Sequence, residues 1–178
     1  MSTVLFTWEL GVGLGHMSCI RPLAREMHRR GDRVVVSLQN FAHANKIFSD
    51  FEVSYVSSPT RFGSMPGMIE KPSTVAHMLN NIGFGAPEEL SALVCCWLQL
   101  FDLIQPDLIV ADHSPTVVLA SRARGIPVAT MGTGFDCPLP RTPFSELRPP
   151  ANRSSQELLA FERSIVDNAN QVLSLIHI

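Results

Sequence analysis

The sequence is poor in charge, and this excludes several classes of protein. Charged residues make up 17% of the 178 residues and hydrophobic residues 46%. Ordinary soluble domains carry roughly 25% charged residues, so a long disordered chain or a charged coiled coil is excluded. Fourteen Lys and Arg against sixteen Asp and Glu give a net charge of −2. This balance offers no basic surface to a nucleic acid or an anionic membrane.

Patterns for metal binding and membrane targeting are missing too. The cysteines, Cys19, Cys95, Cys96 and Cys137, lack the spacing and the nearby histidines of a tetrahedral zinc site, so we interpret them as reduced thiols. The first residues lack the basic and apolar segments of a signal peptide. The most apolar later stretch, 90–104, contains polar residues that exclude a membrane span. We therefore expect a cytoplasmic protein without a transmembrane segment.

Short runs rich in β-branched residues alternate along the chain with amphipathic runs of helical spacing. The alternation predicts an α/β fold, a Rossmann-like doubly wound parallel sheet with helices on both faces. The expected strands span residues 4–8, 33–38, 52–57, 107–111 and 126–131. The expected helices follow residues 11–15 and span 41–48, 87–104, 115–125 and residues from 155 onward, with loops at 57–72 and 132–153.

Two ionisable residues are expected to meet at the carboxyl ends of the strands. In the strand order 3-2-1-4-5, the winding direction reverses between the first and fourth strands, and ligands bind there. His16 follows the first strand and Asp112 closes the fourth. A neutral imidazole can take a proton from a hydroxyl while a carboxylate fixes its tautomer. Each residue has an alternative interpretation. His16 would then only fill the first helical turn. Asp112 would then cap a helix, although Ser114 fits that cap better.

The glycine loop that precedes His16 has two interpretations. Gly11, Gly13 and Gly15 lack the third glycine of the dinucleotide fingerprint, because His16 stands in its place. Residues 37–40 contain no acid that could hold an NAD ribose, which disfavours a dehydrogenase. The loop can still let the backbone approach a ligand closely, so the three glycines are candidate substrate-binding residues.

Other residues at the same edge are weaker candidates. Glu9 and Asp136 end or follow strands and could contact a ligand, and the resemblance described below makes that ligand a sugar or an acceptor, but solvated loop acids are the more frequent finding. His113, next to Asp112, suggests a metal ion shared with His16. We disfavour a metal because adjacent residues leaving a strand point apart and because no other residue has ligand spacing.

Together these residues resemble a known family, the bacterial GT-B glycosyltransferases of the UDP-glycosyltransferase type, in their N-terminal half. The resemblance covers most of residues 3–135 and includes the glycine loop with its histidine. It is carried by residues 6–16, 21–26, 29–34, 107–112 and 125–129.

The resemblance implies a function and roles for two residues. The family transfers a sugar from a UDP-sugar donor to a hydroxyl acceptor, with inversion at the anomeric carbon and without a metal or other cofactor. By the family pattern, His16 is the general base for the acceptor hydroxyl and Asp112 is its partner. Both substrates are small molecules, and no nucleic acid is involved.

The resemblance also implies a second domain that this sequence lacks. We expect residues 1–178 to be a single, truncated acceptor-binding domain that is inactive without the C-terminal nucleotide-sugar domain. One alternative is a non-catalytic acceptor-binding or docking half of a split glycosyltransferase, which would need a donor-binding partner chain. Another is nucleotide-sugar epimerisation on the same fold. The acceptor and the sugar depend on loops 57–86 and 132–153.

Overall fold

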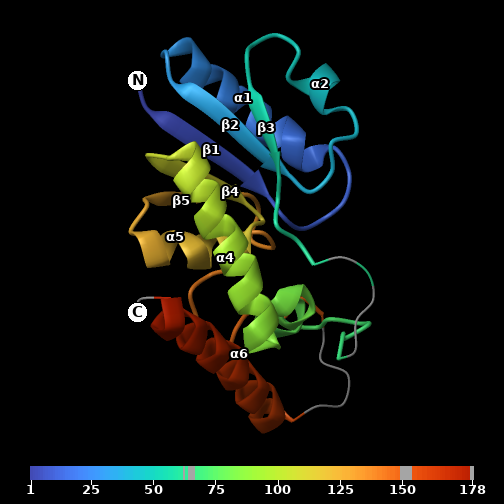
Figure 1. The fold of residues 1–178 in the computed structure, drawn as a ribbon. Coiled ribbons are helices and arrows are strands. Elements are labelled where there is room, and N and C mark those ends of the chain that lie inside the picture. Colours follow the sequence, from blue (N-terminus) through green and yellow to red (C-terminus); the bar gives the residue numbers. More distant parts are fainter. Residues whose placement is uncertain (62, 64–66, 149–153, 177–178) are drawn as a thin grey trace. The chain divides into compact units, whose positions relative to one another are not determined.

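The computed structural model describes residues 1–61, 63, 67–148 and 154–176, and the chain divides into two compact units (Figure 1). The first unit contains Met1–Thr60 and Val94–Gly132, and the second contains Arg61–Leu93 and Thr133–Ile178. All five strands belong to the first unit. This unit therefore holds the sheet edge at which the sequence predicts a site.

The sheet is parallel and has the strand order β3-β2-β1-β4-β5. Its strands are β1 (Thr3–Trp8), β2 (Arg33–Leu38), β3 (Ser54–Ser57), β4 (Leu108–Asp112) and β5 (Val128–Met131). β1 pairs with both β2 and β4, and its last residue, Trp8, lies opposite Leu38 on one side and Asp112 on the other. The order confirms the prediction from the sequence. It places the carboxyl ends of β1 and β4 side by side.

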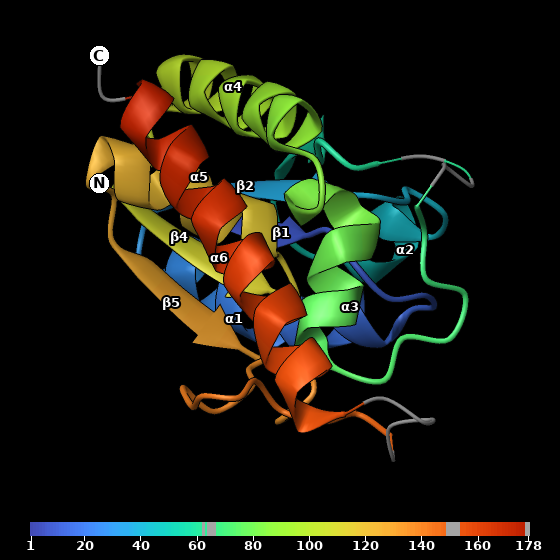
Figure 2. The ribbon, with the colours of Figure 1, turned by 90° about the horizontal axis from the view of Figure 1, so that it is seen from below.

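Helices cover both faces of this sheet. Figure 2 shows α1 (Gly15–Arg29) on one face and α4 (Pro87–Ile104) on the other, with α5 (Pro115–Arg124) on the same side as α4. The short α2 (Ala44–Ile47) follows β2. The core under α1 is formed by buried residues of β1, of β2 and of α1 itself. They are Val4, Phe6, Trp8, Val34, Val36, Leu38, Met17, Ile20 and Ala24. Strands this hydrophobic are typical of a parallel sheet that is buried on both faces.

The second unit consists of helices and loops. α3 (Val75–Leu79) runs into the π-helical turn η1 (Asn80–Phe84), and α6 (Ser155–Ile176) closes the described chain. The Asn168 side-chain amide donates a 2.8 Å hydrogen bond to the carbonyl of Phe84, and so joins α6 to η1. The sequence predicted α6 but not α3 or η1. Two five-residue elements offer too few periodic positions for a helical pattern to be recognised.

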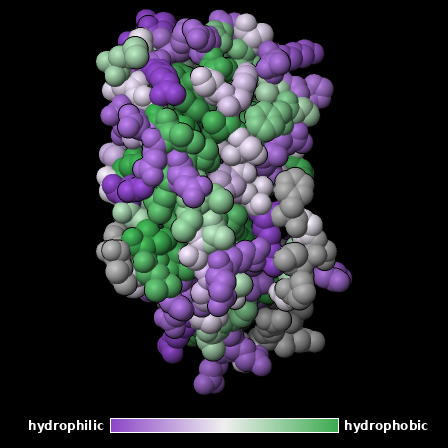
Figure 3. Space-filling model, viewed as in Figure 1, coloured by the Kyte–Doolittle hydropathy of each residue, from purple (hydrophilic) through white to green (hydrophobic). Residues whose placement is uncertain are grey.

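Apolar residues also reach the surface, among them Leu103 of α4. Leu103 near the end of this helix is 79% exposed, and Figure 3 shows hydrophobic residues on the face of the molecule where α4 lies in front. Within the described residues, no helix is both long enough and apolar enough to cross a membrane.

Two neighbouring residues of α4 test this packing. Ile104 is 4% exposed and Leu103 is 79% exposed. We expect Ile104→Ala to lower the free energy of unfolding by about 2–5 kcal/mol, because it leaves a cavity. The matched control Leu103→Ala changes it by less than about 0.5 kcal/mol. Urea unfolding followed by circular dichroism measures both, and equal losses would contradict the burial described above.

Candidate active site

The candidate site lies at the carboxyl ends of β1 and β4, within the first unit. β1 ends at Trp8, residues 9–14 form the glycine loop, and α1 begins at Gly15, so His16 is the second residue of this helix. Asp112 is the last residue of β4 and is the register partner of Trp8. The pairing of the two strands therefore brings the segments that carry His16 and Asp112 together.

His16 and Asp112 are in direct contact. Nδ1 of His16 lies 3.1 Å from Oδ2 of Asp112, and the two side chains are 17% and 3% exposed. Nδ1 is thus the ring nitrogen that faces the carboxylate, and Nε2 is the nitrogen that remains for another group. This arrangement suits an imidazole that accepts a proton at Nε2 while a carboxylate stabilises the imidazolium.

Two further rings flank the imidazole, and the sequence analysis assigned neither of them this role. The Trp8 ring stacks on His16 with a centroid distance of 5.1 Å and an angle of 20°, and the His113 ring stacks on it at 6.0 Å and 29°. The Trp8 indole donates a 2.6 Å hydrogen bond to the carbonyl of Leu10. Trp8 and His113 are both buried, so they restrict the ring plane of His16.

The position of His113 corrects one step of the sequence analysis. We expected Asp112 and His113 to point apart because they are adjacent at a strand end. Both contact His16 instead. The reason is the backbone of His113, which has a φ of 46° and so turns out of the extended conformation in which neighbouring side chains alternate. Among the described residues, no group of three or more His, Cys, Asp or Glu side chains could hold a metal ion.

The three glycines of the loop differ in what surrounds them. Gly11 has a φ of +90°, and a Cβ built on it would overlap Nε2 of His16. Gly13 has a φ of +92° but faces open space, and Gly15 begins α1. The Gln39 side-chain amide donates to the carbonyl of Gly11 and holds this part of the loop. Of the three glycines, Gly11 is the one whose missing side chain leaves room for Nε2 of His16.

Gly11→Ala and Gly13→Ala form a matched pair that tests this contact. Both place a Cβ at a positive φ, which costs roughly 1–2 kcal/mol in each case. Only at Gly11 does the added methyl group overlap His16. We expect Gly11→Ala to shift the NMR signals of the His16 ring and Gly13→Ala to leave them in place. Equal shifts in both variants would mean that the loop does not approach the ring as described.

Glu9 takes a different place from the one predicted. It is 3% exposed, and its two carboxylate oxygens accept hydrogen bonds from the backbone N–H groups of Thr116 at 3.0 Å and Val117 at 2.8 Å. Glu9 therefore caps α5 from the end of β1. Ser114 stands at the N-cap position of α5, as the sequence predicted, but its hydroxyl donates to the carbonyl of Asp112 at 2.9 Å and its side chain makes no capping hydrogen bond.

Burial raises the pKa of Glu9 from its ordinary 4.5 to about 7, although hydrogen bonds from Val117 and Thr116 act in the opposite direction. Between these two pH values the folded chain binds more protons than the unfolded chain. The free energy of unfolding therefore falls as the pH rises through this range. Glu9 alone accounts for a fall of about 3 kcal/mol.

Glu9→Gln removes this titrating group and tests its effect. We expect the free energy of unfolding of the wild type, relative to that of Glu9→Gln, to fall by about 3 kcal/mol between about pH 4.5 and pH 8. Urea unfolding at several pH values measures the difference. The control Glu88→Gln changes an exposed carboxylate and keeps the wild-type slope. Parallel curves for the wild type and Glu9→Gln would contradict the raised pKa.

The remaining predicted residue, Asp136, belongs to the second unit. Its Oδ2 accepts hydrogen bonds from the backbone N–H of Thr133 at 3.0 Å and from the Thr133 hydroxyl at 2.9 Å. These contacts hold a local turn after β5. Its predicted contact to a sugar or an acceptor stays a prediction.

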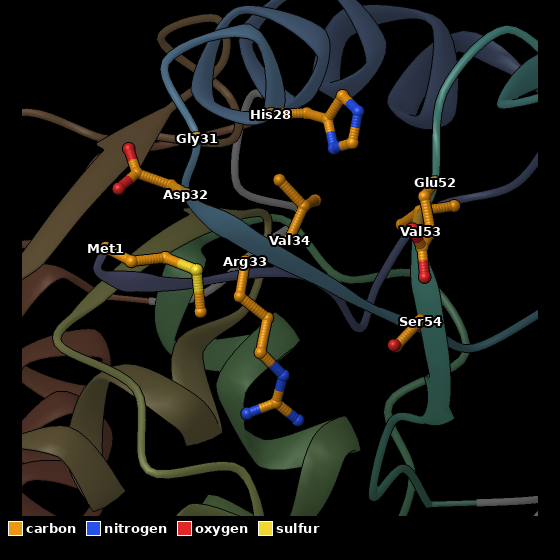
Figure 4. A pocket seen from close by; sticks show the side chains of 9 residues that line it. All are labelled: Met1, His28, Gly31, Asp32, Arg33, Val34, Glu52, Val53 and Ser54. Carbon is orange, nitrogen blue, oxygen red and sulfur yellow. The ribbon is translucent and has the colours of Figure 1, made fainter.

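A pocket at the other end of the sheet contains none of the predicted site residues. It has a volume of about 270 Å³ and lies near the start of β2 and β3 (Figure 4). Its polar lining includes His28, Asp32, Arg33, Glu52 and Ser54. The Arg33 guanidinium already donates to the carbonyl of Ile104 at 3.0 Å.

Comparison with known proteins shows a likeness in fold. No protein-family model matches the chain, and neither does any curated protein sequence. The glycosyltransferase SsfS6 of Streptomyces sp. SF2575 matches 99% of this chain over 46% of its own, with 15% identity and a TM-score of 0.54. Its complex with thymidine diphosphate matches 98% of this chain over 45% of its own, with 18% identity and a TM-score of 0.53.

These matches confirm the Rossmann-like fold predicted from the sequence, in the form found in GT-B glycosyltransferases. The chain spans less than half the length of the SsfS6 chains that it matches.

Proposed function

We propose that this chain is the acceptor-side half of an inverting, metal-independent GT-B glycosyltransferase that transfers a sugar from a UDP-sugar to an acceptor hydroxyl. The observation that carries the proposal is the contact between His16 Nδ1 and Asp112 Oδ2, at 3.1 Å. It lies where the winding of the sheet reverses, which is the place where doubly wound folds bind ligands. The fold shared with SsfS6 supports the reaction class.

The proposed reaction is a direct displacement at the anomeric carbon. The acceptor oxygen forms a bond to this carbon while the bond from the carbon to the UDP oxygen breaks on the opposite face, which inverts the configuration. Nε2 of His16 takes the proton of the acceptor hydroxyl. Asp112 accepts the hydrogen bond from Nδ1 and stabilises the positive charge that develops on the ring, as carboxylates do in other dyads of this kind.

The glycine loop and a donor-binding domain have separate tasks in this proposal. Gly11 leaves Nε2 clear because it has no side chain. The UDP part of the donor is held by a donor-binding domain outside this chain, and the reaction needs both halves around one cleft. The choice of UDP rests on the family resemblance of residues 6–16 and 107–112. SsfS6 itself has been solved with thymidine diphosphate.

His16→Ala tests the proposed base in a protein that joins this chain to a donor-binding domain. We expect kcat to fall by about 10²–10⁴-fold with a small change in KM, because a general base acts in the transition state. Asp112→Asn lowers kcat less, through loss of the charge next to Nδ1. Steady-state rates with UDP-glucose and phenolic or macrolide acceptors measure both effects.

Two controls accompany this experiment. His43→Ala removes an exposed histidine outside the site and leaves turnover unchanged. The chain of residues 1–178 by itself transfers no sugar, because half of a cleft cannot orient two substrates. Near-normal turnover by His16→Ala would show that His16 is not the base, and robust turnover by the isolated chain would overturn its assignment as a half-enzyme.

A further inference from the structure

Glu9 is a buried carboxylate that the proposed reaction does not use. Burying a carboxylate is costly unless its oxygens find donors, and here both oxygens accept backbone N–H groups at the first turn of α5. The donors, Thr116 and Val117, come from a segment far from Glu9 in the sequence. The hydrogen bonds therefore connect two parts of the chain that only the fold brings together.

These two parts are the segments that surround His16. Residues 8–10 leave β1 and supply the Trp8 ring, and residues 112–114 leave β4 and supply the Asp112 carboxylate and the His113 ring. The backbone N–H of Leu10 donates to the carbonyl of His113 at 3.2 Å. Glu9 adds two stronger links on the same side, because hydrogen bonds to a charged acceptor exceed those between neutral groups.

We propose that Glu9 is a positioning residue for His16: by tying the end of β1 to the start of α5, it fixes the Trp8 and His113 rings and the Asp112 carboxylate around the imidazole. This inference rests on the proposed function, in which His16 is the base. Glu9 acts through these neighbours and touches neither substrate.

The residue before α5 does not cap the helix with its side chain, so Glu9 supplies the acceptors for the first turn. Ser114 stands where a side chain would normally cap α5, but its hydroxyl donates to the carbonyl of Asp112. Without Glu9, two N–H groups of the first turn lose their acceptors in a buried place. Only Ser114 separates His113 from the start of α5, so a shift there moves Asp112 and His113, two of the three side chains that contact His16.

The variants of Glu9 differ in how many of the two hydrogen bonds from α5 they keep. Glu9→Gln has the same shape and one carbonyl oxygen, so it keeps one hydrogen bond and turns an amide N–H toward the second donor. Glu9→Ala keeps neither. The matched control is Glu162→Gln, which alters a buried carboxylate of the second unit that accepts the backbone N–H of Phe144.

The ¹⁵N NMR spectrum of the His16 ring tests the proposal directly, because it distinguishes protonation at Nδ1 from protonation at Nε2. We measure it on the chain of residues 1–178 at about pH 8.5, roughly two pH units above the ordinary pKa of an imidazole. The wild type and Glu162→Gln show the Nδ1-protonated form. Glu9→Gln shows a mixture of both forms, and Glu9→Ala shows a larger share of the Nε2-protonated form.

Two results would overturn the proposal. One is a folded Glu9→Gln whose His16 ring keeps the wild-type spectrum. The other is a Glu9→Gln that does not fold at all, because Glu9 would then be required for the fold and not for positioning. Circular dichroism distinguishes the two cases.

A kinetic measurement separates this proposal from the proposed function. In a protein that joins this chain to a donor-binding domain, Glu9→Gln lowers kcat by about 10-fold and changes KM little. Full activity of His16→Ala would contradict the proposed function. The NMR spectrum would still decide whether Glu9 positions the ring of His16. A loss confined to KM would show that Glu9 affects acceptor binding and would contradict its positioning role.

Discussion

The parallel pairing of β1 with β4 is the constraint on which the site depends. It places Trp8 opposite Asp112 at the last register position of both strands. Each strand then leaves the sheet at the same edge, so the glycine loop and the start of α5 emerge next to each other. His16 enters this space from the second position of α1. The approach of His16 and Asp112 is thus a result of strand order and requires no contact between them to drive folding.

Buried polar groups hold the loops at this edge of the sheet in place, because their hydrogen bonds have a direction that apolar contacts lack. The carboxylate of Glu9 caps α5, the hydroxyl of Ser114 holds the carbonyl of Asp112, and the indole of Trp97 donates to the Thr116 hydroxyl at 2.8 Å. Each bond has a defined direction, so together they fix the loops where apolar contacts would let them slide. Burial raises the pKa of the Glu9 carboxyl, and the two backbone N–H donors of α5 act against the cost of burying its charge.

Much of this could be predicted from the sequence, because it depends on periodicity and connectivity. The alternation of strands and helices predicts the parallel sheet, and the order 3-2-1-4-5 expected of one doubly wound fold is the observed one. The predicted strand ends lie within two residues of the observed ones. The juxtaposition of His16 and Asp112 follows from that order. The roles of Glu9 and His113 could not be predicted, because they depend on side-chain direction. A φ of 46° at His113 turns its ring toward His16, and no sequence pattern marks such a turn at a histidine.

The surroundings of His16 also limit how a small molecule can reach its ring. The rings of Trp8 and His113 stack on the imidazole, Asp112 lies next to Nδ1, and Gly11 lies next to Nε2. The side chain is 17% exposed. In the proposed reaction, an acceptor hydroxyl would therefore meet the ring at Nε2, beside the glycine loop. A side chain at Gly11 would occupy the space next to Nε2, so the conformation of this loop would control access to the proposed base.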